Sequence, residues 1–237
     1  MTDALAFEER IPASNVISDR RLEKDELVRL SENEEPYWLV NCDLEKAKLG
    51  KLAFDGWIFD NCNLQGANFT ASSLEKTLWR KCKGGEAFFR AADMPDSIFE
   101  VCDFNNANFE GTGLADSFFD RCKLIGANFI DAKTASLRFE KSLLGDARLK
   151  NVSFRGKKLV GVHFDFATLI ACDFTEAVLE DCSLRGATLK NCKFKDADLR
   201  GANLGGFKLA HARLLKGAMI SPNQAADLLD EIGLEVI

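Results

Sequence analysis

The chain has 237 residues, of which 46% are hydrophobic and 29% are charged, and its formal net charge at pH 7 is −6. No apolar run approaches the eighteen or more residues of a membrane span. The first ten residues lack the basic and apolar regions of a signal peptide. We therefore expect a cytoplasmic protein that does not enter a membrane, built as one long domain with terminal segments.

Residues 1–40 form the first predicted unit, because they do not follow the regular apolar spacing of the rest of the chain. Within them, residues 19–30 carry three leucines among many charged residues: Leu22, Leu27 and Leu30. This spacing predicts a short amphipathic helix that ends before Pro36.

Residues 41–220 form the second unit, and their apolar residues recur with a period of five. From Leu44 to Met219 every fifth position is Leu, Phe, Met or Trp at 34 of 36 places, the exceptions being Gly84 and Thr134. A small residue usually stands two places earlier, so both face one side of a short extended segment. A helix of 3.6 residues per turn does not produce this period. The spacing predicts an uninterrupted register to Met219.

The cysteines indicate how many five-residue units make one turn. Six of them share a column at multiples of twenty residues: Cys42, Cys62, Cys82, Cys102, Cys122 and Cys182. Four units therefore form one square coil, and the region holds about nine coils stacked over about 43 Å. Repeats that stack only on their neighbours form a solenoid.

All eight cysteines, including Cys172 and Cys192 in the opposite column, occupy the inward small-residue register. There is no CxxC pair, so we interpret them as small core residues rather than metal ligands. Spacing alone also permits disulfides between stacked coils, although a reducing cytoplasm argues against them. The two histidines, His163 and His211, are isolated from any nucleophile. We therefore expect no enzyme activity, no cofactor and no metal.

Four large apolar residues stand at outward positions one coil apart: Ile58, Leu78, Ile98 and Phe118. Such an apolar stripe needs a cover. One interpretation is that the N-terminal segment folds back along this face, since a twelve-residue helix spans about 18 Å, similar to four stacked strands. The alternative is that the stripe binds a partner protein.

Residues 221–237 form the third unit. Ser221, Pro222 and Gln224 combine an N-cap, a proline at the first helical position and a capping-box residue. They predict a helix that runs to about Ile232 and stops at Gly233. This helix would cap the open end of the solenoid.

The repeat resembles the pentapeptide-repeat family, whose consensus A(D/N)LXX is close to the stretches 107–111 (ANFEG) and 197–201 (ADLRG). The resemblance covers about three quarters of the chain. It implies an all-β fold, a right-handed quadrilateral parallel β-helix of about nine coils filled by the Leu and Phe column, with short N-terminal and C-terminal helices.

The C-terminal segment resembles that of the Qnr-type quinolone-resistance proteins, through Gln224-Ala225, Leu228-Leu229 and the apolar positions that follow. The resemblance implies a homodimer joined end to end through this segment, which mimics duplex DNA and binds DNA gyrase or topoisomerase IV. It implies protection of that enzyme from quinolones or a toxin. By the same resemblance, six residues would contact the twofold partner: Leu228, Leu229, Ile232, Leu234, Val236 and Ile237.

A DNA mimic presents carboxylates in place of phosphates, and two neighbouring columns of the solenoid do so. The predicted acidic face consists of Asp60, Asp96, Glu100, Asp116, Asp120, Glu140, Glu176 and Glu180. Residues 42–120 have a net charge of −5, but residues 121–219 have +8. A mixed, solvated surface is therefore an equally simple interpretation of these charges. The alternative function is a general protein-interaction scaffold; direct nucleic-acid binding is not expected, because the lysines are scattered over several faces.

Overall fold

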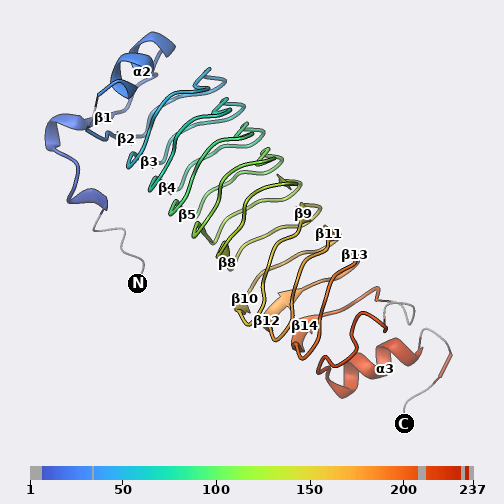
Figure 1. Ribbon diagram of the computed structural model, residues 1–237. Coiled ribbons are helices and arrows are strands. Elements are labelled where there is room, and N and C mark those ends of the chain that lie inside the picture. The colour runs from blue at the N-terminus through green and yellow to red at the C-terminus, as the bar shows by residue number, and fades with distance from the viewer. Residues whose placement is uncertain (1–6, 34, 208–211, 231–232, 235–237) are drawn as a thin grey trace.

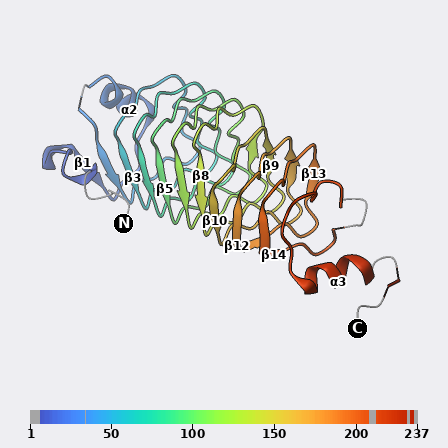
Figure 2. The same cartoon turned by 60° about the horizontal axis from the view of Figure 1, so that its bottom comes forward.

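The chain is wound into a four-sided parallel β-solenoid of about nine turns, with a helix at each end (Figure 1). The computed structural model describes residues 7–33, 35–207, 212–230 and 233–234. Figure 2 shows the coils stacked along one axis, with the two helices at opposite ends of the rod. This confirms the fold class that the period of five predicts.

Each five-residue unit turns the chain by one corner. In the unit that begins at Ala107, the side chains of Ala107 and Phe109 point inward and are fully buried. The corner residues on either side, Asn106 and Gly111, have left-handed backbone conformations with φ of 57° and 66°. One left-handed residue per unit redirects the strand, so four units return the chain to its starting side.

The longest sheet contains seven parallel strands in the order β1-β2-β3-β4-β5-β6-β8. From β2 onward its strands pair in register with residues twenty positions away, so Phe59 lies beside Trp79 and Phe99 beside Phe119. The bounds are β1 Val16–Ser18, β2 Trp38–Val40, β3 Ile58–Asp60, β4 Leu78–Arg80, β5 Ile98–Glu100, β6 Phe118–Asp120 and β8 Arg138–Glu140.

Two further sheets form the second half of the rod. A three-stranded sheet in the order β10-β12-β14 continues the face of the first sheet, but β8 and β10 are not joined in one sheet. A four-stranded sheet in the order β13-β11-β9-β7 covers another side. The bounds are β7 Asn128–Phe129, β9 Arg148–Lys150, β10 Lys158–Val160, β11 Thr168–Ile170, β12 Val178–Ser183, β13 Thr188–Lys190 and β14 Asp198–Asn203.

Aromatic rings fill the interior as parallel stacks. Phe89 lies 5.2 Å from Phe69 and 4.9 Å from Phe109, and Phe109 lies 4.8 Å from Phe129, measured between ring centroids. A second stack meets this one edge to face; Phe119, for example, lies 5.8 Å from Phe109 at 83°. Both arrangements are favourable for aromatic quadrupoles.

The cysteines are buried and unpaired, as expected for core residues. Their thiols face backbone carbonyls of the preceding coil; Cys82 Sγ, for example, lies 3.1 Å from the carbonyl oxygen of Phe59. Burial raises the pKa of the Cys102 thiol, because a thiolate is poorly solvated in the interior. These thiols therefore behave as packing groups.

Gly84 has a steric reason to interrupt the Leu and Phe column. A Cβ atom built on Gly84 would lie 2.0 Å from Cε1 of Phe104. The ring of Phe104 thus occupies the space that a large residue at position 84 would fill. The column remains closed there although one large side chain is missing.

The N-terminal region departs from the predicted helix over residues 19–30. Strand β1 pairs with β2 and extends the first sheet, so the helix α2 begins later and spans Lys24–Ser31. The buried side chains of Leu22 and Leu27 join the main core. Helix α2 therefore closes the end of the rod rather than lying along its side.

The outward apolar stripe is covered by residues that precede this helix. Ile11 packs on Ile58 and Leu78, with Phe7 beside it. Ile58 and Leu78 have no exposed surface. Part of the N-terminal segment thus lies over the stripe, through a short strap at residues 7–11 instead of the predicted helix.

The predicted uninterrupted register to Met219 is wrong at the last coil. Asp198 pairs with Met219, a separation of 21 residues instead of twenty. As a result, Met219 is 48% exposed, while Leu215 is buried. One extra residue in the final coil moves the end of the five-residue series off the inward face; Leu209 of that series lies outside the described residues.

The C-terminal helix α3 spans Pro222–Asp230 and starts with the predicted capping box. The amide of Ser221 donates to Gln224 Oε1 at 2.6 Å, and the amide of Gln224 donates to Ser221 Oγ at 3.2 Å. The predicted end of the helix at about Ile232 lies outside the described residues, and Gly233 has the left-handed φ of 78° that a C-terminal stop requires. The amides of Gly233 and Leu234 donate to the carbonyls of Asp230 and Leu229, which is a Schellman motif.

Candidate protein-binding surfaces

The outward face of the first sheet carries the main column of the predicted acidic face. The strands place Asp60, Arg80, Glu100, Asp120 and Glu140 side by side in consecutive coils. The column is therefore continuous in space, and only Arg80 interrupts its negative charge. Glu180 lies farther along, on β12 of the next sheet.

Most of these carboxylates form ion pairs with basic side chains. Five pairs have short separations between nitrogen and oxygen: Asp60–Arg80 at 2.7 Å, Asp120–Arg121 at 2.6 Å, Glu140–Lys141 at 3.0 Å, Glu176–Arg155 at 2.9 Å and Glu180–Lys158 at 2.9 Å. Such pairs reduce the field that the face presents to a partner. Charge on this surface is thus partly compensated.

Arg80 is the centre of a three-residue network that sequence spacing does not reveal. It bonds Asp60 and also Glu8 of the N-terminal strap, each at 2.7 Å. The hydrogen bond that Arg80 donates to Asp60, together with the one to Glu8, raises the pKa of Arg80. The network holds the strap across the sheet and shields Asp60 from solvent.

The corner column holds the remaining predicted acidic residues. Asp96 and Asp116 are exposed and adopt left-handed conformations one coil apart, with φ of 56° and 58°. Neither forms an ion pair among the residues that the structure describes. Asp96 and Asp116 therefore add exposed carboxylates to the predicted face.

The apolar stripe is largely inaccessible to a partner. Ile58 and Leu78 are buried beneath the strap, and Ile98 is half-buried beside them. Phe118 is 8% exposed, because the guanidinium of Arg138 lies 4.7 Å above its ring centre. As it stands, this surface offers a partner little apolar area.

The C-terminal helix is anchored to the rod by one polar side chain. Gln224 Nε2 donates to the carbonyls of Leu199 and Ala202, at 2.8 and 2.6 Å. Leu228 is half-buried against the core. Gln224 thus both starts the helix and satisfies carbonyls of the last coil.

The apolar residues of this end are incompletely covered. No residue of α3 is fully buried, Leu229 is half-buried, and Leu234 is 52% exposed. Ile232, Val236 and Ile237, which belong to the same predicted interface, lie outside the described residues. The described part of the C-terminal end therefore presents leucines that a second chain could cover.

The described residues contain no cluster of histidine, cysteine and acidic side chains that could hold a metal ion. His163 is accessible, and its Nδ1 lies 4.0 Å from the carboxylate of Asp165. His211 lies outside the described residues. Within the described part of the chain, no helix has the length and apolar character that crossing a membrane requires.

Two family models match the repeat region. The model described as pentapeptide repeats (8 copies) matches residues 39–75, 62–100, 147–186 and 172–210. The model described as pentapeptide repeat region matches residues 85–149. Together they cover the solenoid almost from end to end.

Solved structures with a similar course of the chain have low sequence identity. A trypsin-treated form of QnrB1, a plasmid-mediated fluoroquinolone resistance protein, is 18% identical, with a TM-score of 0.44 over 94% of this chain and 97% of that one. HetL of the cyanobacterium Nostoc sp. strain PCC 7120, involved in heterocyst differentiation regulation, is 20% identical, with a TM-score of 0.29 over 79% and 86%. No curated protein matches the sequence. These similarities carry no functional argument.

Proposed function

Because the chain belongs to the pentapeptide-repeat family, we propose that it is a non-catalytic binding protein that mimics DNA and binds DNA gyrase or topoisomerase IV. Binding would protect the enzyme from quinolones or from a toxin. The support from this chain is the run Glu100, Asp120 and Glu140, which repeats a carboxylate at strand spacing along one face.

A homodimer through the C-terminal segment would make the mimic twice as long. The observation that carries this step is the incomplete burial of Leu229 and Leu234 on a helix that Gln224 fixes to the rod. Leucines on a rigid end can be covered by the same leucines of a second copy, as a twofold interface requires. The interface would be isologous and would leave the acidic column free.

A second candidate, a general protein-interaction scaffold, is favoured by the ion pairs on the acidic face. A surface whose carboxylates are paired with arginine and lysine presents mixed charge, which suits recognition of a protein more than imitation of a polyanion. One experiment distinguishes the two candidates.

The decisive measurement is supercoiling by purified DNA gyrase, with and without a quinolone, across a titration of this protein. Restored supercoiling in the presence of the drug indicates protection, and inhibition without the drug indicates mimicry that lacks the protective step. No effect in either arm favours the scaffold.

Reversing the charges of Glu100, Asp120 and Glu140 to lysine distinguishes the candidates. If the protein mimics DNA, we expect the triple variant to lose gyrase binding, since three favourable charge contacts become repulsive. The matched control reverses Asp146, Asp165 and Asp173, which lie outside the predicted acidic face. Equal loss of binding in both variants would contradict recognition through the acidic column.

For the dimer, we expect Leu229→Asp to give a monomer, because a carboxylate at the centre of an apolar interface is desolvated without a partner. Analytical ultracentrifugation of the wild type and the variant measures this directly. Asp227→Ala, at an exposed position of the same helix, is the control and should remain dimeric. A wild-type protein that sediments as a monomer at all concentrations would refute the interface.

A further inference from the structure

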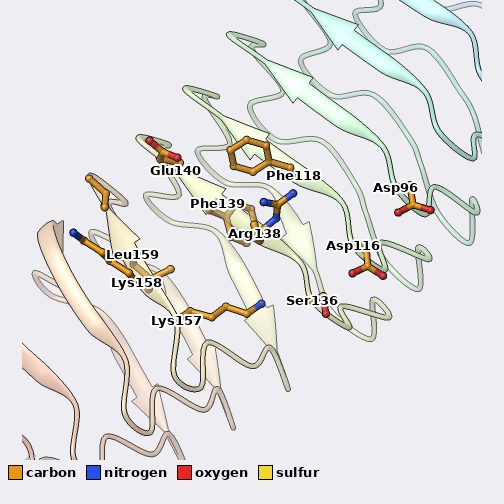
Figure 3. A pocket seen from close by; sticks show the side chains of 11 residues that line it. Asp96, Asp116, Phe118, Ser136, Arg138, Phe139, Glu140, Lys157, Lys158 and Leu159 are labelled. Carbon is orange, nitrogen blue, oxygen red and sulfur yellow. The ribbon is translucent and has the colours of Figure 1, made fainter. Parts of the chain in front are cut away.

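The stack of coils is split on one face, between β8 and β10, where a hollow of about 660 Å³ opens (Figure 3). On the N-terminal side of the split the backbone ladder is regular: the amide of Arg138 donates to the carbonyl of Ser117 at 3.0 Å. One coil later the carbonyl of Leu137 instead accepts a hydrogen bond from Lys157 Nζ at 2.9 Å. A side-chain ammonium thus stands where the backbone amide of the next strand would bond.

The split coincides with a charged residue, Lys157, in an inward column that otherwise holds uncharged side chains. Thr77, Ser97 and Ser117 occupy this inward column with buried side chains, but the next two positions are Leu137 and Lys157. Large side chains alone do not open the ladder, because Tyr37 and Trp57 stack in the same column while the amide of Ile58 donates to the carbonyl of Tyr37 at 2.9 Å. At the split, the ammonium of Lys157 takes the carbonyl of Leu137 in place of a backbone amide. Beside them, Thr134 replaces a large core residue and is only half-buried.

The charged groups around the hollow do not cancel one another locally. Lys158 is paired with Glu180, and Glu140 with Lys141. Within the described parts of the chain, no ion pair includes the other four charged residues of the wall, which are Arg138, Lys157, Asp96 and Asp116. Figure 3 shows both aspartates on the same side of the hollow, with Lys157 reaching from the β10 side toward β8.

The hollow also offers an apolar floor and open backbone groups. Phe118, Phe139 and Leu159 line it between the two charged sides. No backbone bond between Leu137 and Lys158 closes the ladder among the described residues, and the two coils are joined farther along by the amide of Lys141 and the carbonyl of Val160 at 2.8 Å. The strand edges before that bond face the space. An extended chain can pair with such an edge by backbone hydrogen bonds. The volume lies within the usual range for ligand sites.

We propose that this split binds a short extended peptide with free ends. Its ammonium group is held by Asp96 and Asp116, and its carboxylate by Arg138 and Lys157. An apolar side chain lies beside Phe139 and Leu159, since Arg138 already covers the ring of Phe118. Two or three residues at about 3.3–3.6 Å each give a ligand of suitable length. The split shares Asp96, Asp116 and Glu140 with the predicted acidic face, but peptide binding is measured without gyrase, so the two proposals fail independently.

Lys157 is suited to receive a carboxylate. Burial, and to a smaller extent the charge of Arg138, lowers the pKa of Lys157 from its ordinary value, and the charge of Asp116 offsets part of this effect. An anion placed between these two cations relieves their repulsion and bonds to both. Lys157 is thus held near the opening by its hydrogen bond to the carbonyl of Leu137, and a ligand carboxylate can replace that carbonyl as the acceptor.

Isothermal titration with tripeptides Ala-X-Ala, where X is Phe, Leu or Ser, tests the proposal on the full-length protein. We expect saturable binding, strongest for Phe or Leu. Acetylation of the amino end and amidation of the carboxyl end should each weaken binding about tenfold or more, because each removes a charge-assisted contact. If none of the three peptides binds, or if blocking both ends changes nothing, the proposal is wrong.

Two variants locate the site. Asp116→Asn should weaken binding of the free peptide and have little further effect on the acetylated one, since both changes remove the same contact. Lys157→Ala should abolish binding, because it removes a cation of the wall and frees the carbonyl of Leu137 for a backbone amide. Lys158→Ala, which removes an exposed and already paired lysine, is the control. Binding that survives both Asp116→Asn and Lys157→Ala would place the peptide elsewhere and overturn the assignment.

Discussion

Replacing Phe109 with alanine is expected to lower the free energy of unfolding by about 3–5 kcal/mol. Phe109 is fully buried and stacks on Phe89 and Phe129 at 4.9 and 4.8 Å. Its removal leaves a cavity between two rings that the rigid coils cannot close, because each coil is fixed to its neighbours by backbone hydrogen bonds. Urea unfolding followed by circular dichroism measures the change.

Phe88 is the matched control, because it directly precedes the stacked Phe89 in the preceding coil and points outward with 45% of its surface exposed. Phe88→Ala should change the free energy of unfolding by no more than about 0.5 kcal/mol. In a solenoid each coil contacts only its neighbours, so the damage of Phe109→Ala should be concentrated there. Hydrogen exchange should therefore accelerate most in residues 87–129. Equal effects of the two substitutions would contradict the assigned register.

The fold was predictable because the period of five identifies the inward face of every unit. Buried Phe and Leu side chains on one face, with a small residue two places earlier, have only one way to stack. The twenty-residue spacing of Cys62, Cys82 and Cys102 then gives the length of a coil. These buried side chains determine the fold, because only the inward face accommodates them.

The departures from the period have physical causes that spacing does not display. Phe7 and Ile11 belong to no repeat, so nothing in their spacing predicts the surface that they cover. Lys157 stands at an inward small position, and that substitution is the signal from which the split could have been found. The slip before Met219 lies next to residues outside the described part of the chain, where the repeat ends at the cap.

The candidate binding surface was predictable only in part. Sequence spacing gives the column that contains Asp60 and Asp120, but not the side-chain conformations that pair them with Arg80 and Arg121. Long basic side chains can reach several carboxylates, and the choice among them depends on packing around each stem. The charge columns of a solenoid therefore predict where the carboxylates lie, but not how much of their electric field reaches a partner.

Removing residues 1–12 should expose the apolar stripe and destabilise the first coils. Ile58 and Leu78 lose their cover, and exposing a fully buried side chain of this size costs about 1.5–3 kcal/mol. We therefore expect a loss of about 3–6 kcal/mol in the free energy of unfolding, as an upper value. Binding of a hydrophobic dye should rise at the same time. Thermal unfolding and dye fluorescence of the truncated protein measure the two effects.

Glu8→Gln separates packing from charge, because it breaks the ion pair with Arg80 while leaving Phe7 and Ile11 in place. A partly exposed pair of this kind contributes about 1 kcal/mol or less, so this variant should melt close to the wild type and bind little dye. If the truncated protein also melts unchanged and binds no more dye, the strap does not cover the stripe in solution. In that case Ile58 and Leu78 are accessible, and the stripe becomes the first place to look for a partner of the scaffold.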